Sequence, residues 1–411
     1  PANAFPDPAA LYDGIRVAPT VKSDAPIKMG TVDDAFPRAA KVLSAEYQWP
    51  FQSHASMGPA CAVADVRADG ATVWSGTQKP HFAAQGVAKM LNLPPDKVHV
   101  VWMYGPGANG RNDAGDALMD AAVISQAIGK PVRVQYMRHE CTGWDPKGPA
   151  SIHRVRAALD SSGKVTAWDF LSRGFSRYEV AQVENDPGET LVGQMLGAKP
   201  QLAPAFAISE DTYTFDNKRV AWDTIPPLLE KVSPLRSAHV RDPMGPQCHF
   251  ASECFMDDIA AATNADPVAH RLNYLREERD IAVIKAAAEK AGWKAGPLGT
   301  RRGKDGNLLT GQGIAYTRRE ALGTTTYVCV VSDVAVDPAT GRVHVRRFTA
   351  AHDCGLIINP DTLKRVIEGN LVQGLSRAMH EESLFDRRSV TSVDWATYPI
   401  LDVDEIGRAH V

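Results

Sequence analysis

The feature that most constrains the fold is a β-branched run that leads directly into a glycine-rich turn and then a helix. Residues 98–103 are typical of a buried strand, and residues 116–128 have helical spacing that ends at a glycine. Gly105, Gly107 and Gly110 lie between them. Glycines let the backbone approach a ligand closely, and a helix N-terminus presents unpaired N–H groups, so the arrangement suits an anion. A tight turn that only packs explains the same residues equally well.

Two common nucleotide-binding patterns do not fit this turn. A Rossmann site needs an acidic residue at the end of a second strand about 20 residues further on. Here that region is a predicted helix around Asp120, followed by a turn at Lys130 and Pro131. A P-loop needs Gly-Lys-Ser or Gly-Lys-Thr at the end of the turn, where this chain has Gly110-Arg-Asn. The turn therefore gives no support to a nicotinamide or flavin dehydrogenase.

Composition and cysteine spacing narrow the class further. The chain has 411 residues and a net charge of −3, which gives no electrostatic reason to expect a nucleic acid as partner. No apolar run of about 18 residues is present. The cysteines are dispersed without zinc, haem or iron–sulfur spacing, so we predict buried small side chains and no metal ligand set in this chain. They are Cys61, Cys141, Cys248, Cys254, Cys329 and Cys354.

The hydrophobic pattern predicts an α+β fold with mixed sheets in two parts. Residues 1–40 are rich in Pro, Ala and Asp and are expected to be an irregular lead-in. Residues 41–295 form the first predicted domain, and residues 311–405 form the second. The Gly-, Lys- and Arg-rich segment 296–310 is the predicted linker. Hairpins are predicted at 60–74, 154–170 and 325–351, helices at 82–91, 250–263, 267–278, 282–292 and 361–382, and loop for most of 173–234.

Four ordered blocks resemble one protein family. Residues 76–110 are similar to its first cofactor-binding segment, and residues 241–259 contain its Arg-x-x-x-Gly-Pro-Gln element and the following helix. Residues 353–360 (Asp-Cys-Gly-x-x-x-Asn-Pro) and 368–373 (Glu-Gly-Asn-Leu-Val-Gln) resemble its second-domain signature. The family is the molybdenum-cofactor-binding large subunits of molybdenum hydroxylases, in the xanthine dehydrogenase and aldehyde oxidase superfamily.

A subgroup within that superfamily is also indicated. The similarity is to the nicotinate dehydrogenase large-subunit type and the isoquinoline 1-oxidoreductase β-subunit type. Four stretches carry it: 49–59, 143–149, 351–355 and 395–400.

The resemblance implies a cofactor and a reaction. Both predicted domains, 41–295 and 311–405, are expected to bind a molybdenum cofactor that lies between them. Molybdenum is held by a pterin, in bacteria usually the cytosine dinucleotide form, and no protein side chain binds the metal. A general-base glutamate helps to hydroxylate an N-heteroaromatic compound, or to oxidise an aldehyde, with water as the oxygen source. Electrons leave through a small [2Fe–2S] subunit toward a cytochrome c or flavin acceptor, in the bacterial cytoplasm or at the periplasmic face of the inner membrane. The alternatives are a non-catalytic cofactor-binding scaffold and a nicotinamide or flavin dehydrogenase.

The resemblance also implies roles for individual residues. Gln78 matches a glutamine that hydrogen-bonds an oxygen ligand of molybdenum, and Arg241 matches an arginine that stabilises negative charge on the substrate. Gln373 lies in the cofactor-facing block, where Val366 replaces a glutamine that is often present. A turn glutamine, a surface ion pair and core packing are the respective alternatives, and His54 is expected only to pack. The loop that lies against the metal corresponds to Gly107, Ala108, Asn109 and Gly110.

The ends of the chain differ from the family. Its large subunits have a further N-terminal region and carry the general base in a Gly-x-Gly-Glu element beyond residue 400, and neither is seen here. Glu405 lacks the glycine context. We therefore expect both ends to be truncated. Residues 406–411 (Ile-Gly-Arg-Ala-His-Val) match one translation of a common sequencing adapter, so we expect them to be an artefact.

Overall fold

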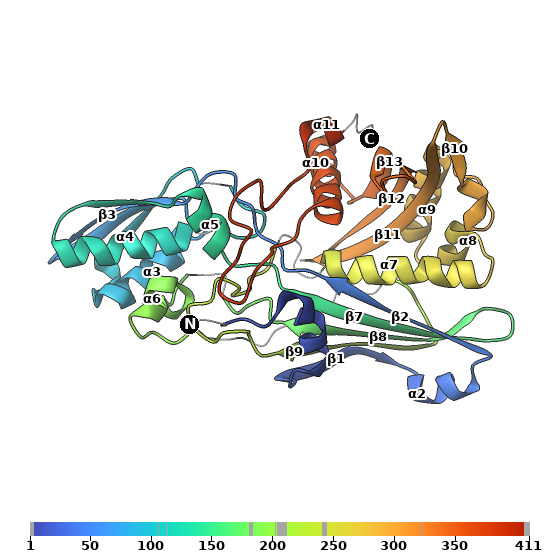
Figure 1. The fold of residues 1–411 in the computed structure, drawn as a ribbon, viewed down its shortest axis with the longest axis horizontal. Helices are drawn as coiled ribbons and strands as arrows, with labels where there is room; N and C mark the ends of the chain where they lie inside the picture. The colour runs from blue at the N-terminus through green and yellow to red at the C-terminus, as the bar shows by residue number, and fades with distance from the viewer. Residues whose placement is uncertain are drawn as a thin grey trace.

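Three β-sheets and their covering helices make up the molecule (Figure 1). The computed structural model describes residues 4–105, 107–112, 114–180, 184–201, 203, 212–240, 245–321 and 323–406. The sheet orders are β1-β9-β8-β7-β2, β5-β4-β3-β6 and β10-β11-β12-β13. The strands are β1 (Lys22–Met29), β2 (Lys41–Trp49), β3 (Cys61–Arg67), β4 (Gly70–Ser75), β5 (Val98–Trp102), β6 (Val132–Gln135), β7 (Ser151–Leu159), β8 (Val165–Phe175), β9 (Asn217–Ile225), β10 (Gly303–Asp305), β11 (Leu308–Ala321), β12 (Thr324–Val336) and β13 (Val343–Asp353).

Helices cover one or both faces of each sheet, and short 3-10 turns join several of them (Figure 1). The α-helices are α1 (Leu11–Val17), α2 (Val32–Ala35), α3 (Pro80–Leu91), α4 (Ala114–Ile128), α5 (Arg138–Trp144), α6 (Leu191–Met195), α7 (Gly245–Ala262), α8 (Pro267–Leu272), α9 (Glu278–Ala291), α10 (Pro360–Met379) and α11 (Val403–Ile406). The 3-10 helices are η1 (Pro8–Ala10), η2 (Phe36–Arg38), η3 (Pro95–Lys97), η4 (Pro187–Glu189) and η5 (Leu298–Arg301).

The sheet that carries the glycine turn agrees with the sequence. The predicted strand 98–103 is β5, which pairs in parallel with β4, and the predicted helix 116–128 is α4. Helix α4 packs on β3 through small buried side chains such as Ala117 and Ala121, which allow a close approach. Helix α3 completes this core and ends at Asn92, whose φ of 55° is a left-handed cap.

The first forty residues correct the expectation of an irregular lead-in. They contain α1, β1 and α2, and β1 pairs antiparallel with β9 at the edge of the five-stranded sheet. The register of that pairing shifts between Asp24 and Ile27, around Pro26. A proline cannot donate to a ladder and is tolerated in an edge strand at such an irregularity. Strand β1 was not predicted because it contains a proline and its mostly exposed side chains lack an alternating apolar pattern.

The largest core lies between two sheets. Helix α7 runs between the five-stranded sheet and the β10–β13 sheet (Figure 1). Trp168 of β8 packs on Phe255 of α7, and the same buried cluster includes Tyr316 of β11 and Val331 of β12. This cluster therefore includes residues on both sides of segment 296–310, which itself contains η5, β10 and the start of β11.

Candidate functional site

The glycine turn between β5 and α4 has an unusual backbone. A Cβ atom on Gly105 would lie 2.7 Å from the carbonyl oxygen of Gly76, so the two segments can approach only without that atom. Gly107 and Gly110 have φ values of +87° and +116°, which L side chains rarely adopt. Around Gly107 the nearest atom to an added Cβ is 3.9 Å away, the backbone nitrogen of Met57. The outer edge of the turn is therefore open.

Gln78 joins the two sides of this turn. Its Nε2 donates to the carbonyl oxygen of Gly110 at 3.2 Å, and its Oε1 accepts from the backbone N–H of Asn112 at 3.1 Å. Asn112 in turn donates through Nδ2 to the carbonyl oxygen of Gly76 at 3.2 Å. A primary amide has two N–H donors and two acceptor lone pairs, so exposed Gln78 keeps one of each for a ligand.

Asn109 connects the turn to the distant helix α10. Its Nδ2 donates to the carbonyl oxygen of His54 at 2.7 Å, and its Oδ1 accepts from Nε2 of Gln373 at 2.6 Å. Residues 109 and 373 are 264 positions apart in the sequence. The structure thus brings Gln78, Asn109, Gly110 and Gln373 into one hydrogen-bonded group, and Ala108 lies exposed between them.

The remaining predicted residue, Arg241, lies outside the described residues, and so do residues 407–411 of the expected adapter segment. Val240, the residue before Arg241 in the chain, is buried, and α7 begins after Arg241 at Gly245. Gln247 in the first turn of α7 is 5% exposed, and its Oε1 has no hydrogen-bond partner. A buried amide oxygen without a partner is costly, which makes it a candidate acceptor for a ligand.

His54 does more than the packing expected of it. Its ring is fully buried, with Nδ1 2.6 Å from the carbonyl oxygen of Pro146 and Nε2 2.8 Å from that of His239. Carbonyl oxygens only accept, so both contacts are hydrogen bonds only when both ring nitrogens carry a proton. Burial lowers the pKa of His54, and the carboxylate of Asp145 opposes that shift. A neutral His54 ring donates to only one of these two carbonyl oxygens, and it packs between Pro146 and His239, which lies in the segment just before residue 241.

A cavity of about 510 Å³ opens beside Gln373. Its walls come from α7, β11, β12 and α10, and its lining is mostly apolar, with Trp49 and Phe250 on one side and Asn370 and Arg377 beside Gln373. The cavity therefore extends from the group of amides into the space between the five-stranded sheet and the β10–β13 sheet.

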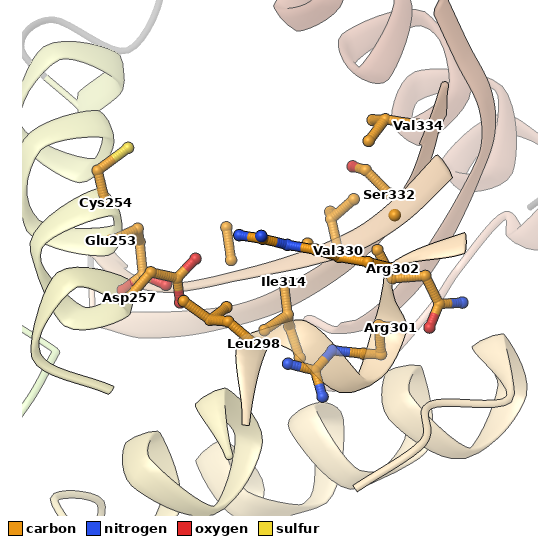
Figure 2. Close-up of a pocket in the computed structure, with 14 residues that line it drawn as sticks. Glu253, Cys254, Asp257, Leu298, Arg301, Arg302, Ile314, Val330, Ser332 and Val334 are labelled. Carbon is orange, nitrogen blue, oxygen red and sulfur yellow. The ribbon is translucent and has the colours of Figure 1, made fainter. Parts of the chain in front are cut away.

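A second cavity of about 430 Å³ adjoins the first and shares Glu253, Cys254, Ala315 and Val330 with it. Figure 2 shows α7 on one side of this second cavity, strands on the other, and the Arg302 side chain lying across the space. Glu253 is not a free base there, because its carboxylate accepts from Nε of Arg271 at 2.9 Å and from other donors.

Comparison with known proteins identifies the family. The molybdopterin cofactor-binding domain family matches residues 17–173, and a second molybdopterin cofactor-binding domain family matches residues 257–407. The chain belongs to the molybdopterin-binding subunits of the molybdenum hydroxylases. In that family's terms, Gln78 and the glycine turn lie in the first matched domain and Gln373 lies in the second.

Two curated molybdenum hydroxylase subunits are similar in sequence. A subunit of nicotinate dehydrogenase of Pseudomonas putida is 33% identical over 98% of this chain and 33% of its own length. The β-subunit of isoquinoline 1-oxidoreductase of Brevundimonas diminuta is 30% identical over 93% of this chain and 46% of its own length. The chain thus spans between a third and a half of these relatives.

Solved molybdenum hydroxylases share the fold. Quinoline 2-oxidoreductase from Pseudomonas putida 86 superimposes with a TM-score of 0.76 at 11% identity, covering 100% of this chain and 74% of that chain. The aldehyde oxidoreductase of Desulfovibrio gigas gives a TM-score of 0.71 at 16% identity, covering 95% of this chain and 57% of that chain. The predicted α+β fold with two cofactor-binding domains is confirmed.

Within the part of the chain that the structure describes, no helix is both long and apolar enough to cross a bilayer. Over the same residues, no group of three or more His, Cys, Asp and Glu side chains is arranged to hold a metal ion.

Proposed function

We propose that this chain is the molybdenum-cofactor-binding part of an oxidoreductase that hydroxylates an N-heteroaromatic compound or oxidises an aldehyde, with water as the oxygen source. The observation that carries the proposal is the hydrogen bond between Asn109 and Gln373, which joins the two matched cofactor-binding domains beside an open glycine turn. The similar proteins named for nicotinate, isoquinoline and quinoline support the heteroaromatic class, and the aldehyde oxidoreductases support the other.

The residues present fit a pterin. A pterin ring carries several hydrogen-bond donors and acceptors without a net charge, and the amides of Gln78, Asn109 and Gln373 offer both kinds of group without charge. Exposed Gly107 and Ala108 leave room for a flat ligand at the edge of the turn. The adjoining cavity of about 510 Å³ gives space for a longer form of the cofactor, and we propose the cytosine dinucleotide.

The bound cofactor supplies the oxygen transfer and accepts the two electrons. In our proposal the protein orients it: Gln78 directs its remaining N–H toward the cofactor, and Gln373 keeps α10 against the turn. Arg241 is proposed to stabilise negative charge that develops on the substrate. The general base is proposed to be a glutamate outside these 411 residues.

We also propose that the chain works in a heteromer. The two curated relatives described above are both named as subunits of larger enzymes. A small [2Fe–2S] subunit is the proposed electron acceptor, because the six cysteines of this chain have no iron–sulfur spacing. A cytochrome c or a flavin then takes the electrons, in the bacterial cytoplasm or at the periplasmic face of the inner membrane.

The test is metal and nucleotide analysis of the full-length protein, produced with its maturation factors and its neighbouring subunits. We expect about one molybdenum per chain and release of a cytosine nucleotide on acid treatment. Turnover in isotope-labelled water should place the label in the product. Folded protein that is reproducibly free of metal would contradict the proposal. Metal without turnover on either substrate class would indicate a non-catalytic scaffold.

A further inference from the structure

We propose that Glu184 is a positioning residue for the cofactor-facing turn. Its buried carboxylate holds the chain on the side of Gln78 and Gly110 that faces away from the cofactor. This inference rests on the proposed function, since it concerns how the turn is kept ready for the cofactor. No sequence pattern pointed to it, because Glu184 lies in a weakly patterned stretch expected to be loop.

The carboxylate of Glu184 contacts the neighbours of both site residues. Thr77 Oγ1 donates to Glu184 Oε2 at 2.6 Å, and Arg111 Nη2 lies 3.8 Å from Glu184 Oε1. Thr77 immediately precedes Gln78, and Arg111 immediately follows Gly110. One carboxylate therefore fixes, from behind, the same two segments that the Gln78 side chain bridges in front.

Two helices lack side chains where Glu184 enters. A Cβ atom on Gly86 of α3 would overlap the carbonyl oxygen of Glu184. A Cβ atom on Gly115 of α4 would lie 2.6 Å from its Cδ atom. Glycine inside a helix costs roughly 0.5–1 kcal/mol relative to alanine. This cost applies to Gly86 inside α3, whereas Gly115 lies in the first turn of α4. Glu184 occupies the slot between the two helices.

Glu184 is itself held in a costly state. Its φ is +57°, in the left-handed region that non-glycine residues rarely adopt. Its backbone N–H donates to Oε2 of Glu189 at 2.7 Å, and Lys89 Nζ donates to the carbonyl oxygen of Asn185 at 2.8 Å, which fixes the segment on α3. Burial raises the pKa of Glu184, and Arg111 and Thr77 oppose that shift. Strain and a buried carboxylate concentrated at one residue are characteristic of functional sites.

The experiment uses the full-length, molybdenum-loaded complex with two substitutions. Glu184→Gln keeps the size and an acceptor for Thr77 but replaces the carboxyl oxygen that faces Arg111 with an amide NH₂ group. Thr77→Val removes the hydroxyl donor at nearly constant volume, and it decides the matter if Glu184→Gln does not fold. For each variant we expect kcat to fall on the order of ten- to a hundred-fold, because a displacement of about 1 Å at a reacting centre can have that effect.

The readouts distinguish positioning from general stability. We expect molybdenum per chain and KM to stay close to wild type, while the electron paramagnetic resonance signal of the metal changes shape. The matched control is Glu179→Gln, another buried carboxyl group, whose pKa is raised to about 8 by burial and which is therefore already neutral at pH 7. It should keep the wild-type kcat and signal.

Two outcomes would overturn this inference, and a third would overturn only the proposed function. Wild-type kcat and signal in both variants would overturn it. Activity that falls only in proportion to lost metal, with unchanged activity per metal, would show a structural role and overturn it as well. A wild-type complex without molybdenum would instead overturn the proposed function, which separates the two failures.

Discussion

At the scale of single residues, the turn is connected to the rest of the molecule by neutral amides, while charged groups lie behind it. Gln78, Asn109 and Gln373 face the open side, and Glu184 and Arg111 face the interior. Neutral donors keep the same hydrogen-bonding capacity across the pH range in which proteins are stable. A pH response of this protein is therefore expected from its buried ionisable groups.

Replacing Gln373 with Ala tests the link between the two domains. The change leaves Asn109 Oδ1 without its partner on α10 and should lower the free energy of unfolding by about 1 kcal/mol. We expect the full-length protein to lose its molybdenum faster on dialysis, measured as metal per chain against time. Lys364→Ala, an exposed change on the same helix, is the control and should retain metal like wild type. Equal retention in both variants would contradict a role for this bond.

Glu179 gives a pH dependence of known sign. Its pKa is raised from 4.5 to about 8 by burial, so between these values the unfolded chain ionises while the folded protein stays protonated. Unfolding thus becomes easier as pH rises through this window, by at most about 1.4 kcal/mol per pH unit. We expect the stability of Glu179→Gln relative to wild type to increase from pH 5 to pH 8, measured by denaturant unfolding. A difference that is constant with pH would contradict this assignment.

Resemblance to the family supplied Gln78, Asn109, Gly110 and Gln373, but neither His54 nor Glu184. The Nε2 atom of His54 contacts a carbonyl 185 positions away, and Glu184 binds a hydroxyl 107 positions away. Their roles depend on segments that meet only in the folded chain. Periodicity and spacing describe neighbours within about one turn or strand, so they carry no signal for such contacts.

At the scale of elements, local signals worked where the side-chain pattern was regular. The helices α3, α4, α9 and α10 and the β12–β13 hairpin match their predictions within a few residues. Strand β9 was missed because two of its buried positions are Lys218 and Thr224, which break the alternation of apolar residues. Lys218 Nζ donates to the carbonyl oxygen of Tyr213, and that bond allows its burial.

The start of α10 is open to a direct test. Asn359 caps the helix by accepting from the backbone N–H of Thr362 at 3.0 Å, and Pro360 follows it. Asn359→Ala should lower the free energy of unfolding by about 1 kcal/mol, whereas Asn359→Asp should keep the cap. Thermal unfolding of both variants measures the difference. Equal melting temperatures would show that packing alone sets the start of this helix.

At the scale of the whole molecule, the proposed cofactor site lies where the two matched domains meet. Helix α7 shares its core with two sheets, and the glycine turn contacts α10 through the hydrogen bond from Gln373 to Asn109. A ligand bound at that contact stabilises the folded state by mass action. The resemblance to the family predicted two cofactor-binding domains, whereas the contact between Asn109 and Gln373 is seen only in the folded chain.

Removal of the cofactor should therefore lower the melting temperature. We expect the loaded full-length protein to unfold on the order of 5 °C above the metal-free form, measured by scanning calorimetry. Gln373→Ala should narrow that difference, because it weakens the contact across which the cofactor is proposed to lie. Identical melting temperatures for loaded and metal-free wild type would contradict binding at the junction.

The position of Asn109 also affects how fast this protein deamidates during storage. Asn109 is followed by Gly110, and in an asparagine–glycine pair the next peptide nitrogen readily attacks the side-chain amide carbon, which closes a ring and releases ammonia. Both ends of the Asn109 amide are occupied here, by the carbonyl oxygen of His54 and by Gln373, which opposes the rotation that ring closure needs. Hydrolysis of the ring would leave a carboxylate facing that carbonyl oxygen. We therefore expect the contact between Asn109 and Gln373 to slow this deamidation. Protein stored with α10 detached should accumulate the form with a carboxylate at position 109.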